Sequence, residues 1–155
     1  MPLREPDTSW PEAMAAFRAG KRPAGLVDGV GLEESGISVT HELTAASVGS
    51  GDLPVLASPA IVALVERAAV RALGWRLPPE LTTVGASFVL THSAPTPAGD
   101  EISMDVRLEP GDSRKLRFEF AVHDGAGEVA RGSHVRVIVE REPFMRAADG
   151  RRVKG

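Results

Sequence analysis

The sequence predicts an α+β fold in which an antiparallel sheet wraps around one long central helix. Between residues 58 and 74, apolar side chains cover most of the helix circumference, which is typical of a helix buried in a core. Four segments between residues 82 and 140 alternate apolar and polar residues with the two-residue period of strands that have one wet face. One further strand candidate precedes the helix. The pattern therefore favours one helix enclosed by a sheet.

The composition is that of an ordinary globular domain. The 155 residues are 43% hydrophobic and 25% charged, with a net charge of −3, so no global field favours nucleic acid or a membrane as partner. There is no cysteine, which excludes disulfides, a thiolate nucleophile and Cys-ligated zinc. His41, His123 and His134 lack metal-ligand spacing, so no metal site is expected. The sequence has no secretory signal pattern and no apolar run of membrane length, so we expect a cytoplasmic protein.

Three parts are expected along the chain. Residues 1–35 are predicted to form an N-terminal extension, residues 36–142 the folded domain, and residues 143–155 a basic C-terminal tail. A solvated, frayed end explains the basic residues of the tail more simply than an arm that binds nucleic acid.

The N-terminal extension is expected to contain a short helix followed by a loop. Ser9 and Pro11 suit an N-cap and a first turn, and Gly20 suits a helix end. Three apolar residues between them fall at helical spacing and predict that the helix docks by that edge: Trp10, Met14 and Phe17. The Gly-rich segment 21–36 predicts a loop.

The central helix has clear start and stop signals. Ser58 is suited to the N-cap, Pro59 to the first turn, and Gly74 to the end. Before the helix, residues 37–48 are a strand candidate, which residues 49–52 break with glycine and aspartate.

After the helix, the alternating segments predict four strands and an antiparallel meander. Turn residues at 109–113 and 124–127 separate the later strands. The expected strands cover residues 82–93, 101–109, 114–123 and 128–140.

A histidine stands at the end of the first of these strands, in an apolar row. Alternation places one set of side chains on a single face: Val84, Ala86, Phe88, Leu90 and His92. A Pro-rich turn follows at once. Taken alone, a histidine at a strand end is more often a satisfied imidazole than a functional group.

The central helix carries a carboxylate that is equally out of place. The neighbours of Glu66 at i±3 and i±4 are all Ala or Val, so no cation on the same helix can pair with it. Either a cation from a strand or partner subunit neutralises Glu66, or Glu66 and His92 form an acid–base pair. The second alternative indicates an enzyme.

The blocks LVERAAVRAL (residues 64–73) and GASFVLTHSAPTPAG (residues 85–99) resemble the hotdog-fold acyl-CoA thioesterases of the fluoroacetyl-CoA thioesterase type. A weaker third block comprises residues 123–125 and 132–136. The resemblance implies a hotdog fold, a homodimer with acyl-CoA in a cleft between subunits, and coenzyme A as part of the substrate rather than a cofactor.

The resemblance also implies a catalytic set of Glu66, His92 and Ser58. In this set, Glu66 attacks the acyl carbon or deprotonates water, His92 shuttles protons, and Ser58 orients the substrate or the carboxylate. The helix N-terminus after Pro59, or the backbone amide of Gly85, would supply N–H groups to the thioester oxygen.

Two departures from the family pattern concern the substrate. Ser58 stands where the family typically has threonine, and residues 50–57 contain none of the aromatic residues that gate the fluoroacetyl-selective pocket. This argues against fluoroacetyl selectivity. Three residues of this segment are expected to line the site for a small or medium acyl group: Leu53, Val55 and Leu56. Four arginines are candidates for the CoA phosphates, although strand faces usually carry such charges: Arg71, Arg114, Arg117 and Arg136.

The prediction is thus an acyl-CoA thioesterase, and three alternatives stay open. A non-catalytic hotdog module that binds acyl-CoA would keep the pocket without turnover. A hydratase or dehydratase on the same fold usually has an Asp–His pair before the helix, and no such pair precedes Ser58. A purely structural interaction module would show no stabilisation by CoA or acyl-CoA.

Overall fold

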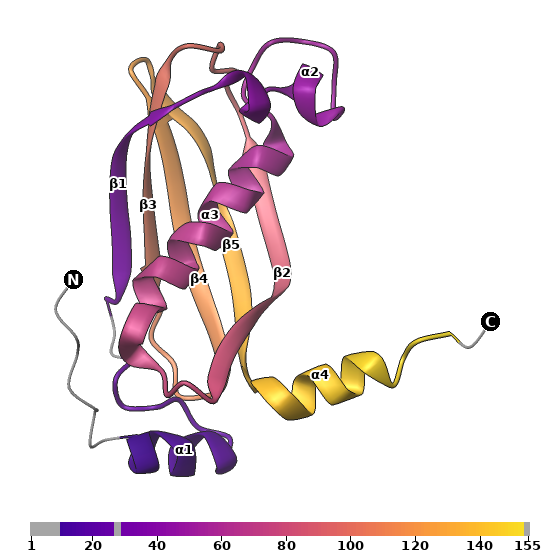
Figure 1. Ribbon diagram of the computed structural model, residues 1–155. Helices are drawn as coiled ribbons and strands as arrows, with labels where there is room; N and C mark the ends of the chain where they lie inside the picture. Colours follow the sequence, from indigo (N-terminus) through magenta and orange to yellow (C-terminus); the bar gives the residue numbers. More distant parts are fainter. Residues whose placement is uncertain (1–9, 27–28, 154–155) are drawn as a thin grey trace, which may run out of the picture.

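A five-stranded antiparallel sheet wraps around one long helix in the computed structural model, which describes residues 10–26 and 29–153 (Figure 1). The helix is α3 (Ser58–Leu73). The strands are β1 (Gly31–Ser38), β2 (Leu81–His92), β3 (Glu101–Leu108), β4 (Lys115–Asp124) and β5 (Gly127–Glu140). The shorter helical elements are α1 (Trp10–Arg18), η1 (His41–Leu43), α2 (Ala45–Val48), η2 (Gly74–Arg76) and α4 (Arg141–Asp149). The predicted α+β architecture is confirmed.

The strand order, β1-β3-β4-β5-β2, corrects part of the predicted meander. Among the described strands, only β3, β4 and β5 are consecutive neighbours, whereas β2 pairs with β5 and no described residue pairs with its other edge. The connection from β2 to β3 therefore crosses the end of the sheet. It is fixed there by the amides of Ser93 and Ala94, which donate to Val129, and by the amide of Gly99, which donates to Val39.

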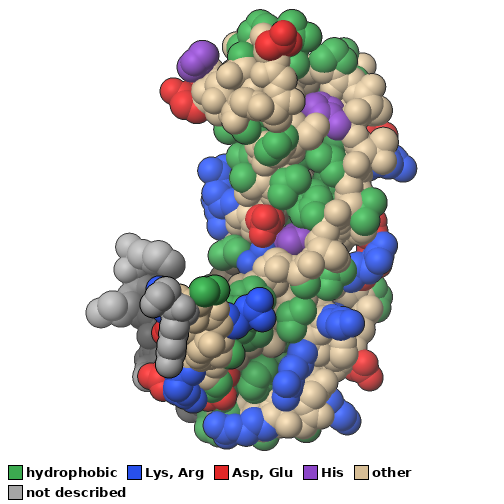
Figure 2. All heavy atoms as spheres, turned by 90° about the vertical axis from the view of Figure 1, so that its right-hand side faces the viewer, with side chains coloured by type: hydrophobic (Ala, Val, Ile, Leu, Met, Phe, Trp, Pro, Cys, Tyr) green, Lys and Arg blue, Asp and Glu red, His purple; other side chains and the backbone are tan. Residues whose placement is uncertain are grey.

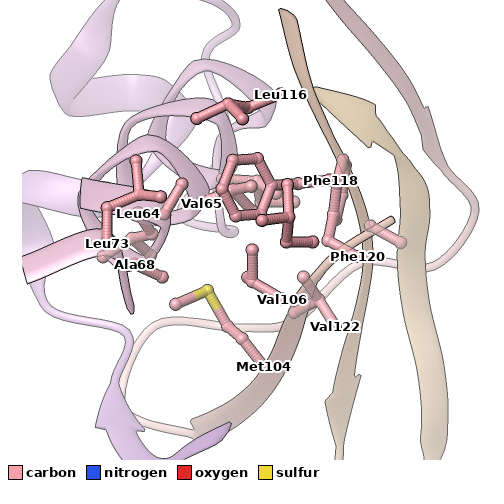
Figure 3. Close-up of a cluster of buried hydrophobic side chains, with 14 of the residues drawn as sticks. Leu64, Val65, Ala68, Leu73, Met104, Val106, Leu116, Phe118, Phe120 and Val122 are labelled. Atoms are coloured by element: carbon pink, nitrogen blue, oxygen red, sulfur yellow. The ribbon is translucent and has the colours of Figure 1, made fainter. Parts of the chain in front are cut away.

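The core lies between α3 and the inner face of the sheet (Figure 3). The inward residues of β3 and β4 are those that the alternating pattern predicts. Leu64, Val65 and Ala68 of α3 meet these strand residues in one buried cluster. On the other side of α3, Arg71 forms an ion pair with Glu34 of β1 at 3.2 Å.

The strand before α3 lies earlier in the chain than predicted. The prediction of a strand over 37–48 is wrong: β1 ends at Ser38, and the residues beyond it form η1 and α2. The sequence of β1, GLEESGIS, has few β-forming residues, and Gly36, with a φ of 69°, lies in an irregularity of its pairing with β3. Since β1 is an edge strand, backbone pairing with β3 sets its conformation more than propensity does.

A β-bulge at Ala86 changes the direction of the side chains along β2. The end of β2 faces α3 as predicted, because Phe88 lies opposite the buried His134. The start faces the other way, since Val84 lies opposite Val137 on the outer face. The prediction of one continuous face from Val84 onward is therefore wrong. An extra residue reverses the alternation, and a simple period-2 pattern cannot show it.

The N-terminal helix docks as expected. Phe17 of α1 is buried, and Arg114 binds it twice: the guanidinium donates to the Phe17 carbonyl and lies 4.2 Å from the ring centroid. The predicted N-cap, Ser9, lies outside the described residues. Gly20 ends the helix with a φ of 77°.

The C-terminal segment is a helix where a frayed tail was predicted. Helix α4 begins directly after β5 and runs outward past β2, on the side of the sheet opposite β1 (Figure 1). No residue of α4 is buried. The segment was predicted from its basic composition alone, and the amphipathic pattern of its helix was not recognised.

Candidate active site

Ser58 and His92 form a hydrogen-bonded pair at the start of α3. The Ser58 hydroxyl oxygen lies 2.8 Å from His92 Nδ1. The end of β2 brings the imidazole to this point, and the first turn of α3 presents the hydroxyl. Ser58 is exposed and His92 is half-buried. The two residues therefore form one unit, with the hydroxyl as its solvent-facing member.

The hydroxyl of Ser58 does not cap the helix. The N-cap residue is Ala57, with extended dihedral angles of −79° and 141°, and no side chain caps the helix there. The prediction of Ser58 as N-cap is therefore wrong. The amides of Ala60 and Ile61 both donate to the Ala57 carbonyl, so the helix N–H groups after Pro59 are already bonded. A substrate oxygen would have to be bound by other donors.

The second ring nitrogen of His92 has no partner among the described residues. Nε2 is buried, and no hydrogen bond satisfies it. The ring is thus anchored only through Nδ1 and the Ser58 hydroxyl. Any proton that His92 exchanges with a bound molecule has its open route through that hydroxyl.

Glu66 lies two turns further along α3 and pairs with a cation from β5. Its Oε2 accepts from Arg136 Nη1 at 3.1 Å, and the Arg136 side chain is only 7% exposed. A strand cation therefore pairs with Glu66, as one interpretation of the sequence predicted. The ion pair does not exclude the acid–base interpretation, because the Glu66 side chain is still 40% exposed.

Arg136 joins Glu66 to a buried polar network. The guanidinium donates from Nε to the Thr83 hydroxyl at 2.9 Å and from Nη2 to the Thr83 carbonyl at 3.1 Å. Its Nη1 also lies 3.1 Å from His134 Nε2. His134 Nδ1 is 2.9 Å from the Ser87 carbonyl, so Nδ1 carries the proton and Nε2 accepts from the arginine.

Burial holds His134 in its neutral form. Desolvation lowers the pKa of His134, and the positive charge of Arg136 acts in the same direction. The hydrogen bond to the Ser87 carbonyl opposes desolvation more than the Arg136 charge assists it, and the Glu66 carboxylate is the weakest opposing influence. A neutral His134 is what the bond from Arg136 requires, since a protonated ring would have no lone pair to accept it.

Gly85 allows the strand backbone to approach the carboxylate of Glu66. A Cβ at this position would lie 2.7 Å from Glu66 Oε2 and 3.4 Å from a ring carbon of His134. A side chain there would displace the carboxylate or the strand. Gly85 therefore shapes the site by leaving space.

Glu66 and His92 are too far apart to touch within one subunit. Eight residues separate Ser58 from Glu66 on α3, which corresponds to about 12 Å along the helix axis. His92 is bonded to Ser58, while the described contacts of the Glu66 carboxylate are with Arg136 and His134. The structure thus brings Ser58 and His92 together and places Glu66 in a second cluster on the same side of the molecule.

Both clusters lie on the side of the molecule that carries β2. Figure 2 shows this side, with acidic and histidine side chains set among hydrophobic ones and with Lys and Arg gathered over its lower half. Within residues 10–26 and 29–153, no three side chains of His, Asp or Glu gather as metal ligands would. No helix in the same ranges has the length and apolar character needed to span a membrane.

The predicted substrate-binding residues have different environments. Leu53 is 61% exposed, Val55 is half-buried, and Leu56 lies in the core at 1% exposure. The segment is fixed to the connection after β2, because Val55 pairs with Pro97 and the amide of Ala98 donates to Pro54.

The four arginines proposed for the CoA phosphates are all engaged by protein groups. Arg136 holds Glu66, Arg114 holds the Phe17 carbonyl, Arg71 pairs with Glu34 and Arg117 with Glu119. Arg136 is also buried, which removes it from contact with a phosphate group at the surface.

Sequence reasoning missed Arg136 and His134 as supports of Glu66. A usable signal was present: both occupy inward positions of β5, in phase with the buried Ala130 and Ile138. A charged or polar residue in an apolar period is the same signal that identified Glu66 and His92. This signal was hard to recognise because the outward positions between residues 131 and 136 also include polar residues. The segment therefore shows no simple apolar–polar alternation.

Comparison with known proteins supports the same fold. The model of the fluoroacetyl-CoA-specific thioesterase family matches residues 39–142. Among curated proteins, the fluoroacetyl-CoA thioesterase of Streptantibioticus cattleyicolor is 33% identical over 90 residues, which are 58% of this chain and 65% of that protein. The match thus spans slightly less than two thirds of the length of that relative.

Solved structures give the same result. The fluoroacetyl-CoA thioesterase FlK aligns with a TM-score of 0.75 at 25% identity and covers 83% of this chain and 98% of its own. A threonine-to-serine variant of FlK in complex with acetyl-CoA aligns with a TM-score of 0.76 at 25% identity, covering 83% and 100%. A hot-dog-like protein from Thermanaerovibrio acidaminovorans, 18% identical, has a TM-score of 0.74 over 84% of this chain and 96% of its own. The predicted hotdog fold is confirmed.

Proposed function

Because the chain belongs to the family of fluoroacetyl-CoA-specific thioesterases, we propose that it hydrolyses a small or medium acyl-CoA thioester to the free acid and CoA. The observation that carries this proposal is the Ser58–His92 hydrogen bond. This bond joins the imidazole of His92 to the exposed hydroxyl of Ser58, which does not cap the helix. Ser58, His92 and Glu66 are the proposed catalytic residues.

We propose that the working site combines two subunits of a homodimer. Groups that act on one thioester must lie within about 3 Å of its reacting atoms, and Ser58 and Glu66 of one chain are separated by about 12 Å along α3. The unpaired edge of β2 offers backbone groups to a second copy. Antiparallel pairing of two β2 edges about a twofold axis would bring Glu66 of one subunit to the Ser58–His92 pair of the other.

The pairing register follows from this requirement. Gly85 lies beside Glu66, so Gly85 of one subunit must lie opposite the partner's His92. Because Ala86 is an extra residue in each β2, the pairing between the two bulges is centred on Val89, and this register places the twofold axis at Val89. Val89 supports it, since its side chain is 63% exposed in the single chain.

The chemistry follows from the two clusters. Glu66 attacks the thioester carbon or takes a proton from a water molecule that attacks it, and the C–S bond then breaks. The Ser58 hydroxyl gives its proton to the departing sulfur and receives one from His92 Nδ1. A proton of the consumed water later returns to His92 through the same hydroxyl, which restores the starting state. Arg136 and His134 keep the carboxylate in position during both steps. If Glu66 is the nucleophile, water then cleaves the acyl–Glu66 anhydride, and the products are the acid and CoA in either route.

The substrate class is narrowed by the segment beside Ser58. Leu53 and Val55 offer modest apolar side chains, and no aromatic residue lies between residues 50 and 57. FlK variants form complexes with fluoroacetate and CoA and with acetyl-CoA. We therefore propose that the preferred substrate has a short acyl group, and we expect no preference for fluoroacetyl-CoA over acetyl-CoA. The protein is proposed to act in the cytoplasm without a metal or other cofactor.

The test is thiol release from a panel of acyl-CoAs of increasing length, including acetyl-CoA and fluoroacetyl-CoA. We expect turnover by the wild type and a loss of about 10²- to 10⁴-fold in both Glu66→Gln and His92→Asn, the range typical of a lost acid–base group. Matched controls are Glu34→Gln, whose partner is a surface arginine, and His123→Asn, an exposed strand histidine.

Different outcomes separate the alternatives. Turnover that survives both site variants, with the fold intact, would show that the chemistry lies elsewhere. Absence of turnover with any acyl-CoA, together with a rise in melting temperature on adding CoA, would favour the non-catalytic binding module.

A further inference from the structure

Helix α4 exposes an apolar face that no described residue of its own chain covers. One side of the helix carries Glu142, Arg146 and Asp149. Apart from Arg141 at its start, the rest of the circumference is apolar: Pro143, Phe144, Met145, Ala147 and Ala148. Phe144 is 40% exposed and Met145 is 54% exposed. An amphipathic helix of this kind requires a surface on which to bury its apolar side.

The helix is attached to its own subunit only at its first residue among the described contacts. The Arg141 amide donates to the Glu80 carbonyl at 2.9 Å, and its guanidinium donates to the Pro79 carbonyl at 2.8 Å. Beyond this anchor the helix runs away from the sheet, past β2 (Figure 1). Isolated helices shorter than about 12–15 residues are marginal in water, so nine residues need packing against another surface.

The register of the proposed dimer indicates which surface that is. The partner's β2 ends at its His92, opposite Gly85, so Leu81, four residues before Gly85, lies beside the partner's connection between β2 and β3. Helix α4 starts beside Glu80, immediately before Leu81. It therefore leaves its own subunit at the level of the partner's connection between β2 and β3.

That part of the partner carries the complementary features. Leu53 is 61% exposed. It lies two residues before Val55, which pairs with Pro97 of this connection. The same end of the fold carries four exposed acidic residues: Glu42, Asp52, Asp100 and Glu101. Residues 141–153 carry four arginines and two acidic residues, so this segment is net positive even though Arg146 and Arg152 pair with Glu142 and Asp149 within it. Apolar surface and opposite charge thus match between the two ends of the molecule.

We propose that α4 of each subunit packs its apolar face on Leu53 and Val55 of the partner, beside the partner's Ser58–His92 pair. Phe144 and Met145 then form one wall of the partner's acyl-binding site and help to set acyl length. The occupant of the α4 face is a second copy of this chain, and twofold symmetry buries both helices in the same way. This inference rests on the proposed dimer, but its first test needs no turnover.

The absence of cysteine from the sequence permits a direct test by disulfide trapping. Leu53→Cys and Phe144→Cys are made as separate proteins, mixed under conditions of subunit exchange and oxidised. We expect a disulfide-linked dimer that contains one chain of each kind. The matched control pairs Leu53→Cys with Glu142→Cys, which lies on the polar side of the same helix, and we expect little cross-linking there.

The double variant Leu53→Cys/Phe144→Cys shows whether α4 packs on the partner subunit or on its own subunit. A linkage between two chains supports the proposal, whereas a bond within one chain would show that α4 folds back on its own subunit and would overturn it. Equal cross-linking of Phe144→Cys and Glu142→Cys would overturn it as well, as would a monomer in light scattering.

Acyl preference gives a second, independent readout if the enzyme turns over. Phe144→Ala should change the ratio of kcat/KM between a short and a medium acyl-CoA by about tenfold, since one methylene in an apolar pocket is worth about 10- to 200-fold. Glu142→Ala should leave the ratio unchanged. An unchanged ratio in Phe144→Ala would exclude a role of α4 in acyl selection.

Discussion

The two halves of the candidate site differ in how firmly the protein holds them. At the start of α3, Ser58 and His92 share one hydrogen bond, and the hydroxyl is exposed. Two turns later, Glu66 meets a buried arginine that is itself bonded to His134 and Thr83. The first half is held by a single hydrogen bond at the surface, whereas the buried bonds of the second half contribute to the fold.

This difference predicts how substitutions divide between activity and stability. Changes in the Ser58–His92 pair should reduce turnover and leave the free energy of unfolding nearly unchanged. Changes in the cluster of Glu66, Arg136 and His134 should alter both, because buried polar groups lose their partners.

The largest effect is expected from Ser58→Ala. In the proposed mechanism this hydroxyl relays the proton from His92, so its loss should lower kcat by about 10²- to 10⁴-fold. The free energy of unfolding should change by less than about 0.5 kcal/mol, because the hydroxyl caps no helix amide. Thiol release and urea unfolding measure the two quantities, and Ser58→Thr, which keeps the hydroxyl, should retain most activity. A loss of about 1 kcal/mol with normal turnover would instead indicate a capping role.

Arg136→Gln should produce the largest loss of stability. The variant leaves Glu66, His134 Nε2 and the Thr83 oxygens with fewer donors, at a cost of about 1–3 kcal/mol. Urea unfolding measures this cost. The control Arg117→Gln removes a guanidinium from an exposed strand position and should cost less than about 0.5 kcal/mol. Equal effects of the two variants would mean that the network around Glu66 does not support the fold.

Gly85→Ala should reduce turnover through the position of the Glu66 carboxylate. The added Cβ would lie 2.7 Å from Oε2, so the carboxylate must move, and we expect kcat to fall by at least about tenfold. Gly125→Ala is the matched control, since a Cβ there meets no atom within 4 Å. Unchanged turnover in Gly85→Ala would show that the carboxylate works from another position.

The pH dependence of stability should report on the buried His134. Its pKa is lowered by burial, so the unfolded chain binds a proton at a higher pH than the folded chain. The contribution of neutral His134 to the free energy of unfolding is fully present above the usual histidine pKa of about 6.5. It falls as the pH drops below that value, by at most about 1.4 kcal/mol per pH unit. Urea unfolding at about pH 7.5 and 5.5 should give a smaller difference for His134→Asn than for the wild type. His41→Asn, at an exposed site, should behave as the wild type does.

The sequence predicted most of the elements around the core. The alternation in β3 and β4 and the apolar circumference of α3 reflect burial directly, and burial is what the hydrophobic pattern records. Glu66 and His92 stood out because they interrupt such patterns. The same rule applied to β5 would have identified Arg136 and His134.

Other features depend on tertiary contacts that a local pattern does not contain. Pairing with β3 determines β1 despite weak propensity, and one extra residue at Ala86 reverses the faces of β2. The role of Ser58 is a further case, since a serine before a proline fits an N-cap equally well. Only the tertiary position of His92, at the end of β2, shows which group the Ser58 hydroxyl binds.

The most direct test of the central claim is complementation between two inactive variants. If each site takes Glu66 from one subunit and Ser58–His92 from the other, mixing Glu66→Gln with His92→Asn creates heterodimers with one intact site. After full exchange, half the dimers are mixed and one of their two sites works, so about a quarter of wild-type turnover should return. Mixing that restores no activity, with heterodimers demonstrated by a mass tag, would contradict the shared site.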